Sequence, residues 1–91
     1  EPIEGIEEMK KNRNVIDGKN LTNGPGKLTK ALAITKELDK IDATRGDEKL
    51  AITKNGTQGI EIVSSHRIGV TRDLPQELRL FIKANKYVSK P

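Results

Sequence analysis

The chain has 91 residues, so it forms at most one small domain, and a chain of this length buries only about 60–65% of its unfolded surface. It contains no cysteine and a single histidine, which excludes a disulfide framework and a zinc site built from nitrogen and sulfur ligands. No apolar run approaches the roughly 18 residues that a membrane span requires, so the sequence predicts a soluble protein. The absence of cysteine fits a reducing, intracellular compartment, which in a bacterium is the cytoplasm or nucleoid.

The net charge of +4 is unevenly distributed along the chain. Residues 1–9 carry four Glu and no basic residue, whereas residues 10–36 carry seven Lys or Arg against Asp17 alone. A basic block of this density is typical of a protein that binds a polyanion such as nucleic acid. A solvated, lysine-rich surface explains the same composition, and both interpretations stay open at this point.

A short amphipathic helix is predicted at the start of the chain. Pro2 suits the first turn of a helix, and Ile3, Ile6 and Met9 form an apolar stripe at helical spacing. The polar residues and glycine of segment 12–24 then predict an irregular loop.

A second helix is predicted to begin within the segment NGPGK, residues 23–27. Asn23 can cap this helix, and Pro25 suits its first turn. Its apolar stripe consists of Leu28, Ala31 and Leu32. The stripe either continues to Ile41 or stops at a break near Thr35.

The apolar period changes from helical to alternating after residue 42. Alternation predicts one strand around residues 50–52 and a returning strand around residues 60–62, joined by a hairpin turn at Asn55-Gly56. A last strand is predicted from Leu78 to Ile82. The fold class is therefore α+β, with short N-terminal helices followed by antiparallel strands.

Two catalytic motifs are excluded by their spacing. The Gly-Lys pair at 26–27 lacks the earlier glycine of a triphosphate-binding loop, because Leu21 occupies that position. Ser65 and His66 are neighbours on a predicted strand, so their side chains face opposite ways and cannot form a nucleophile–base pair. Ser64 shares a face with His66, but no carboxylate is placed beside them, which favours a structural histidine.

The segment from Asn23 to Lys27 has a narrower chemical meaning. Free N–H groups at the start of a helix favour an anion, and two glycines allow a second backbone to approach closely. Lys27 and Lys30 lie one turn apart and add positive charge. A tight entry into the helix explains the same residues without any ligand.

Four motifs follow one another along the chain: EPIEGIEEM, LTNGPGKLTKALAIT, RIGV and LRLFIKANKYVSK. In this order and at this spacing they resemble the C-terminal half of the 3-methyladenine (alkylpurine) DNA glycosylase family, which includes the mammalian alkyladenine glycosylase. The resemblance extends from Glu1 to Lys90, and NGPGKL is its most specific part. It implies that residues 1–91 are the C-terminal portion of one methylpurine glycosylase domain, without the N-terminal catalytic portion.

The resemblance implies a monofunctional enzyme of DNA base-excision repair that needs no metal or cofactor and is a monomer when complete. Such an enzyme flips an alkylated or deaminated purine out of double-stranded DNA and hydrolyses its N-glycosidic bond. An alkylated purine is a good leaving group, so a positioned water and a general base suffice. In this family the general-base Glu precedes the first motif, so no catalytic residue is assigned here, and the fragment alone is expected to be inactive.

The resemblance also implies roles for individual positions. Asn14 aligns with a residue of the base pocket that rejects guanine, and Ile68 and Gly69 match a segment lining that pocket. Lys19 stands about where relatives carry an Arg near the catalytic water, and it keeps the charge but loses the planar fork. The candidate DNA contacts are Asn23, Gly24, Gly26, Lys27, Lys30 and Arg67.

Functions of other classes stay open on the charge distribution alone. The chain is alternatively a stand-alone basic nucleic-acid-binding module without catalysis, or an inert remnant of a split gene. A stand-alone module is expected to unfold in one sharp cooperative transition, whereas half of a domain is expected to fold poorly by itself.

Overall fold

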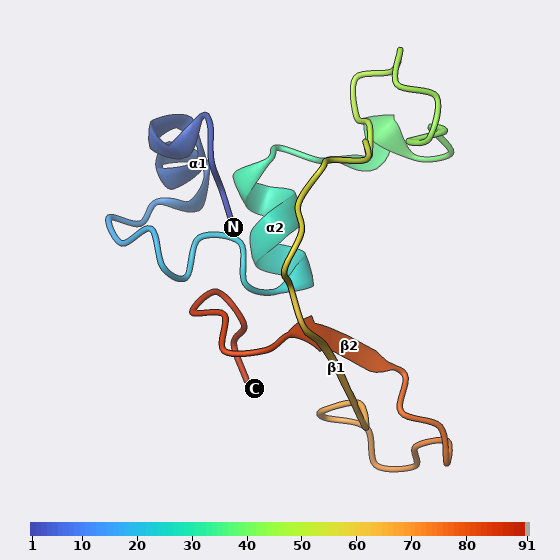
Figure 1. Ribbon diagram of the computed structural model, residues 1–91. Helices are drawn as coiled ribbons and strands as arrows, with labels where there is room; N and C mark the ends of the chain where they lie inside the picture. Colours follow the sequence, from blue (N-terminus) through green and yellow to red (C-terminus); the bar gives the residue numbers. More distant parts are fainter. Residues whose placement is uncertain (91) are drawn as a thin grey trace. The chain divides into compact units, whose positions relative to one another are not determined.

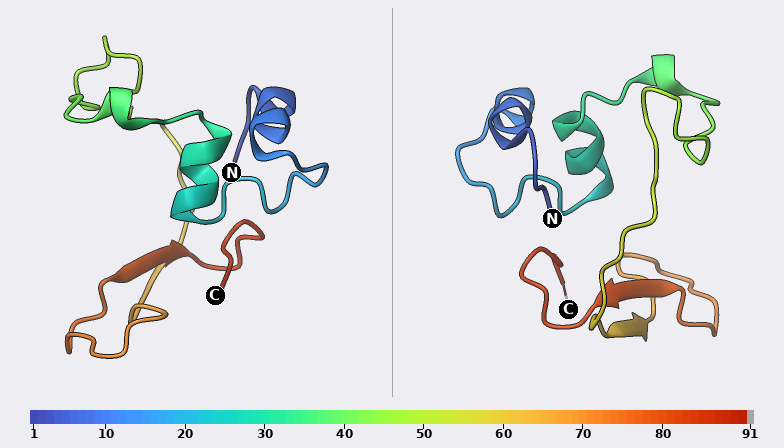
Figure 2. Two further views of the ribbon diagram at one scale, coloured as in Figure 1. Left: turned by 180° about the vertical axis from the view of Figure 1, so that it is seen from behind. Right: turned by 45° about the horizontal axis from the view of Figure 1, so that its top comes forward.

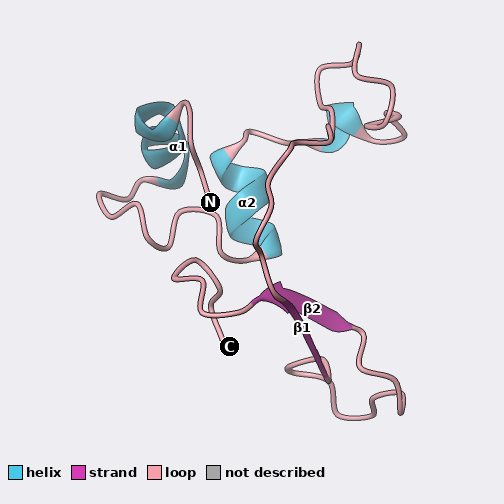
Figure 3. Cartoon of the chain, viewed as in Figure 1, coloured by secondary structure: helices cyan, strands magenta, loops and turns pink. Residues whose placement is uncertain are grey.

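The computed structural model describes residues 1–90 and divides them into two compact units. The first unit, residues 1–56, contains the helices α1 (Ile6–Arg13) and α2 (Pro25–Ala31) and the short 3-10 helix η1 (Lys36–Leu38). The second unit begins at Thr57 and contains the strands β1 (Ile62–Ser65) and β2 (Arg79–Ile82) (Figure 1, and Figure 3 by element type). Helices followed by an antiparallel pair of strands confirm the predicted α+β class.

Helix α1 begins later than the sequence predicts. Gly5 precedes it in the left-handed conformation, with φ of 69°, and this reversal separates Pro2 and Ile3 from the helix. Ile3 is consequently 82% exposed and belongs to no helical stripe. The helix also continues through Asn12 and Arg13, so the predicted loop from residue 12 begins two residues too early.

Helix α2 begins at Pro25, as predicted, but Asn23 does not cap it. The capping position is Gly24, which has extended backbone and makes no side-chain capping bond. The Asn23 amide instead donates to Oδ1 of Asn20 at 2.8 Å. Because Pro25 is the first helical residue, the cap must be its immediate neighbour, which places Asn23 one residue too early for this role.

The chain leaves α2 through a Schellman-type end. The N–H of Ala33 donates to the carbonyl oxygen of Lys30 at 3.2 Å, and the N–H of Ile34 donates to that of Thr29 at 2.8 Å. Ala33 takes the left-handed conformation, with φ of 52°. The helix therefore stops rather than continuing to Ile41, and only the single turn of η1 follows.

Helices α1 and α2 lie side by side and enclose the small core of the first unit (Figures 1 and 2). Leu21, from the connecting loop, is fully buried, and Ala31 is 1% exposed. The side chain of Arg13 reaches back into this loop, where Nη1 donates to the carbonyl oxygens of Asn20 at 2.8 Å and Leu21 at 2.7 Å. The loop between the helices is thus held by a side chain of α1.

The predicted hairpin around Asn55-Gly56 is wrong. Residues 51–60 form neither helix nor strand, and Ile52 is 75% exposed. The partner of β1 is β2, antiparallel, with Val63 opposite Phe81. Alternation of apolar residues specifies which faces a strand presents but not which strand it pairs with. The prediction of a last strand at Leu78–Ile82 is confirmed by β2.

The two faces of this sheet differ in burial. Side chains of opposed residues share a face, so Val63 and Phe81 lie on one face, where both are half-buried. Ile62 and Leu80 project to the other face, where they are 53% and 68% exposed. A two-stranded sheet is at best marginally stable alone, and this one carries an uncovered apolar face.

Candidate nucleic-acid interface

The entry to α2 brings together two of the predicted DNA-contact residues. Nζ of Lys27 donates to Oδ1 of Asn23 at 3.1 Å. Lys30 follows one turn later in the same helix, and the side chains of both lysines are exposed. Lys27 therefore lies in the first turn of α2 and Lys30 in its last turn.

The chain's own packing does not require Gly24 and Gly26 to be glycines. Gly24 has φ of −166°, an extended conformation that any residue adopts. A Cβ atom at Gly24 would meet Cδ of Lys27 at an ordinary contact distance of 3.7 Å, and one at Gly26 would meet nothing within 4 Å. The surface above Gly26 is therefore open, which suits the close approach of a second backbone, whereas Gly24 lies against the side chain of Lys27.

Asn14 has a clear structural reason to be asparagine. It ends α1 in the left-handed conformation, with φ of 52°, and its N–H donates to the carbonyl oxygen of Lys11 at 3.1 Å. Asparagine tolerates this conformation better than other non-glycine residues do. Its exposed side chain borders an open hollow of about 450 Å³.

Lys19 lies in a turn that Asp17 organises. The N–H of Lys19 donates to Oδ1 of Asp17 at 2.9 Å, as in an Asx turn. The Lys19 side chain is exposed. The turn sets the position of the backbone and leaves the ammonium group free to move.

The segment Arg67–Val70, which we call the 67–70 loop, follows β1 and carries the other predicted pocket residues. Gly69 has φ of 78°, a left-handed conformation in which a side chain is strained. Ile68 is 49% exposed. Arg67 and Ile68 border an open hollow of about 570 Å³, whose other lining residues are Leu78, Arg79, Leu80, Ser89 and Lys90.

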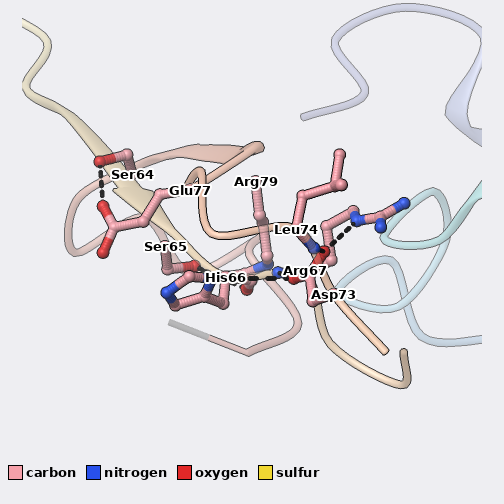
Figure 4. A network of polar contacts seen from close by, with 8 residues as sticks. All are labelled: Ser64, Ser65, His66, Arg67, Asp73, Leu74, Glu77 and Arg79. Carbon is pink, nitrogen blue, oxygen red and sulfur yellow. Dashed lines mark hydrogen bonds and ion pairs between the residues drawn. The ribbon is translucent and has the colours of Figure 1, made fainter. Parts of the chain in front are cut away.

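Asp73 anchors the 67–70 loop (Figure 4). Its Oδ1 accepts from Nε of Arg67 at 2.8 Å, and its Oδ2 accepts from the Arg67 backbone N–H, also at 2.8 Å. The hydrogen bond from the Arg67 side chain is the main cause that lowers the pKa of Asp73 below its ordinary 3.8. Nδ1 of His66 lies 3.8 Å from Oδ2 of the same carboxylate.

The structure excludes a serine nucleophile at Ser64-Ser65-His66. Ser64 donates its hydroxyl hydrogen to Oε2 of Glu77 at 2.6 Å, and Ser65 donates to the carbonyl oxygen of His66 at 3.2 Å. Each hydroxyl has a single hydrogen, so neither donates to the imidazole. The prediction that no carboxylate lies beside these residues is wrong, because the return of the chain through residues 73–77 places Glu77 beside Ser64 and Asp73 beside His66.

Arg79 has a structural role. Its Cζ lies 4.3 Å above the centre of the Phe81 ring, and Nη1 donates to Oγ of Ser65 at 3.2 Å. Its Nη2 donates to the carbonyl oxygen of Lys90. These contacts join β2 to β1 and to the end of the described chain.

The family model described as "Methylpurine-DNA glycosylase (MPG)" matches residues 1–86. The chain belongs to this family. Relatives named "Putative 3-methyladenine DNA glycosylase" come from several bacteria. The one from Mesorhizobium japonicum is 40% identical over 91 residues, which are 100% of this chain and 43% of the relative. The one from Staphylococcus haemolyticus is 45% identical over 93 residues, which cover 98% of this chain and 45% of the relative.

The methylpurine-DNA glycosylase family membership confirms the resemblance that the four motifs indicated. The relative from Clostridium novyi is 41% identical over 103 residues, 99% of this chain and 49% of its own length. The chain therefore spans somewhat less than half the length of these relatives.

Within this glycosylase-family chain, the predicted site residues fall into local groups. Asn23, Gly24 and Lys27 meet at the entry to α2, and Arg67, Ile68 and Gly69 are consecutive in the 67–70 loop. The sequence analysis did not identify Asp73 or Glu77 as part of this group. Asp73 follows Arg67 by six residues in the loop between the two strands, a separation that allows the two side chains to meet. Glu77 accepts a hydrogen bond from Ser64.

Residues 1–90 of the glycosylase-family chain do not gather three or more metal-binding side chains at one place. None of the helices described in this part of the chain has the length and apolar character needed to cross a membrane.

Proposed function

We propose that the chain is part of a monofunctional DNA base-excision repair enzyme, which acts inside the cell on double-stranded DNA. The enzyme flips an alkylated or deaminated purine out of the duplex and hydrolyses its N-glycosidic bond. The observation that carries this proposal is the family match over residues 1–86. The names of the relatives from Mesorhizobium japonicum and Staphylococcus haemolyticus support the 3-methyladenine lesion as one substrate.

In this proposal the chain supplies contacts to the DNA backbone. The group at the entry to α2 comprises Asn23, Gly24, Gly26, Lys27 and Lys30. Its exposed lysines and open backbone fit a phosphate, and the exposed guanidinium of Arg67 fits a second one. Each phosphate neutralised by a cation releases counterions, so binding weakens as salt rises.

The chain also supplies part of the base pocket in this proposal. The exposed side chain of Asn14 faces the purine and clashes with the exocyclic amino group of guanine. Ile68 gives the pocket an apolar wall, and the left-handed Gly69 lets the backbone approach the base. Lys19 stands near the attacking water and holds a positive charge there.

The catalytic base and the rest of the pocket come from the other part of the family domain. Only Leu21 and Ala31 are fully buried among the described apolar residues, which is a small core for a stand-alone module. Ile62 and Leu80 leave one face of the sheet uncovered. Both observations support a partner segment with apolar side chains and count against the alternative of an independent nucleic-acid-binding module.

A chimera tests the proposal. The first part of the Staphylococcus haemolyticus relative, up to its match with this chain, is fused to residues 1–91, and the fusion is called the chimeric domain. We expect it to release hypoxanthine or 3-methyladenine from duplex DNA, and the 91-residue chain alone to release none. Efficient release by the chain alone would show that the catalytic base lies within residues 1–91. A folded chimeric domain that releases no purine would contradict the proposed function.

Charge variants of the chimeric domain test the DNA contacts. The double variant Lys27→Ala, Lys30→Ala removes two cations beside α2 and should reduce the dependence of log K on log salt by about 1.8, since each phosphate contact contributes roughly 0.9. The control is Lys49→Ala, Lys54→Ala, which makes the same change of charge in a region without predicted DNA contacts. If both double variants change the salt dependence equally, Lys27 and Lys30 act only through the net charge of the protein and make no specific phosphate contact.

A further inference from the structure

We propose that Asp73 is a positioning residue that holds the guanidinium of Arg67 in the orientation required to bind a DNA phosphate. The proposal rests on the proposed function, which makes Arg67 a contact to the DNA backbone. It adds an acidic residue to an interface that otherwise contains only cationic, amide and apolar groups.

The carboxylate of Asp73 accepts hydrogen bonds from both the side chain and the backbone of Arg67. One oxygen accepts from Nε in the side chain and the other from the backbone N–H, each at 2.8 Å. Oδ1 also accepts from the N–H of Leu74 at 2.8 Å, which fixes the carboxylate itself. The Asp73 side chain is only 15% exposed, although the loop around it is exposed.

This geometry leaves the outer edge of the guanidinium available. Arginine has five N–H donors, and Asp73 takes the one on Nε. In residues 1–90 the side chain of Arg67 makes no other hydrogen bond to protein, and it is 43% exposed. Figure 4 shows its two terminal nitrogens pointing away from Asp73. Two parallel N–H groups on Nη1 and Nη2 match the oxygens of a phosphate.

The proposal and net charge alone predict opposite changes in DNA affinity when Asp73 is neutralised. The variant Asp73→Asn removes a negative charge, so long-range electrostatics alone predicts tighter binding to DNA. Loss of positioning predicts weaker binding, because Arg67 then becomes disordered before it meets the phosphate. Glu77→Gln is a matched control, because it removes the same charge from the same unit and Glu77 bonds to Ser64 rather than to a cation.

The experiment measures the affinity of the chimeric domain for a fluorescent DNA duplex over a series of salt concentrations. We expect Asp73→Asn to weaken binding about two- to fivefold, the range for an exposed ion pair that stops holding a side chain. Glu77→Gln should leave binding unchanged or tighten it, and Asp73→Glu should recover part of the loss. In an Arg67→Ala background, Asp73→Asn should cause no further weakening.

A second measurement needs no DNA. Hydrogen exchange at Nε of Arg67, followed by ¹⁵N NMR, should be slower in the unmodified chimeric domain than in its Asp73→Asn variant. Equal exchange rates in the two proteins would overturn the positioning role of Asp73. The same role would be overturned if Asp73→Asn bound DNA as tightly as the unmodified protein, or more tightly. If the unmodified chimeric domain does not bind DNA while Nε of Arg67 is still protected from exchange, the role of Arg67 at a phosphate is overturned, and the result counts against the proposed function instead.

Discussion

Asn12 in α1 donates a hydrogen bond from its side-chain amide to the carbonyl oxygen of Ala31 at the end of α2, at 2.9 Å. The two residues are 19 positions apart, and the bond satisfies one of the carbonyl groups that a helix end leaves without a partner. It closes the core of the first unit on the side of Ala31, which is 1% exposed.

We expect Asn12→Ala to lower the free energy of unfolding of the chimeric domain by about 1 kcal/mol, because a half-buried hydrogen bond is lost and Ala31 keeps an unsatisfied oxygen. Urea denaturation followed by circular dichroism measures the change. Gln58→Ala, at an exposed position, is the control and should change stability by less than about 0.5 kcal/mol. Equal losses in both variants would contradict a specific role for Asn12.

Some cations of the basic block, residues 10–36, stabilise the fold, and others are exposed without such a role. Arg13→Ala removes both hydrogen bonds to the loop that carries Leu21, so it should cost about 1–2 kcal/mol of stability. Lys11→Ala makes the same change of charge two residues earlier, on an exposed side chain, and should leave stability nearly unchanged. Thermal unfolding of the chimeric domain compares the two, and similar melting temperatures would show that Arg13 is not a structural residue.

Gly69 should tolerate no side chain. Gly69→Ala forces a left-handed conformation on an L-residue and should cost about 1 kcal/mol or more. Gly56→Ala is the control, because Gly56 has no left-handed backbone and open space around it. Chemical denaturation should therefore separate the two variants. A neutral Gly69→Ala would mean that the 67–70 loop adopts another conformation in solution.

Acid should weaken the 67–70 loop through Asp73. The pKa of Asp73 in the folded chain is lowered by the hydrogen bond from Arg67, so the unfolded chain binds this proton more readily. The stabilising contribution is present above the ordinary pKa of 3.8 and is lost as the pH falls through the lower folded value. Melting temperatures measured from pH 5 to pH 2.5 should fall more steeply for the wild type than for Asp73→Asn. Parallel curves would contradict the prediction.

The uncovered sheet face should mediate association with the other part of the domain. Leu80 is 68% exposed on that face, so Leu80→Ser should weaken binding of residues 1–91 to the separately produced first part of the Staphylococcus haemolyticus relative. Leu74→Ser, at a leucine that is 54% exposed outside the strands, is the control and should bind normally. Titration calorimetry measures both, and equal affinities would place the partner on another surface.

Part of the candidate site was predictable because it is encoded in consecutive residues. The motif containing Arg67, Ile68 and Gly69 identifies its own loop, and the requirement for glycine at position 69 follows from local backbone geometry. Asp73 was not predicted, because its role depends on how the chain returns after the loop.

Features that depend on near neighbours in the chain could be predicted from the sequence. Pro25 starts α2 because its ring fixes φ and needs no hydrogen-bond donor. Residues 78–82 form a short run rich in apolar residues, which favours a strand. The order of the four motifs likewise identified the family. The pairing of β1 with β2 and the hydrogen bond from Asn12 to Ala31 depend instead on the three-dimensional fold. Such contacts join distant residues, and a residue's own pattern of neighbours carries no information about which of several compatible partners it meets.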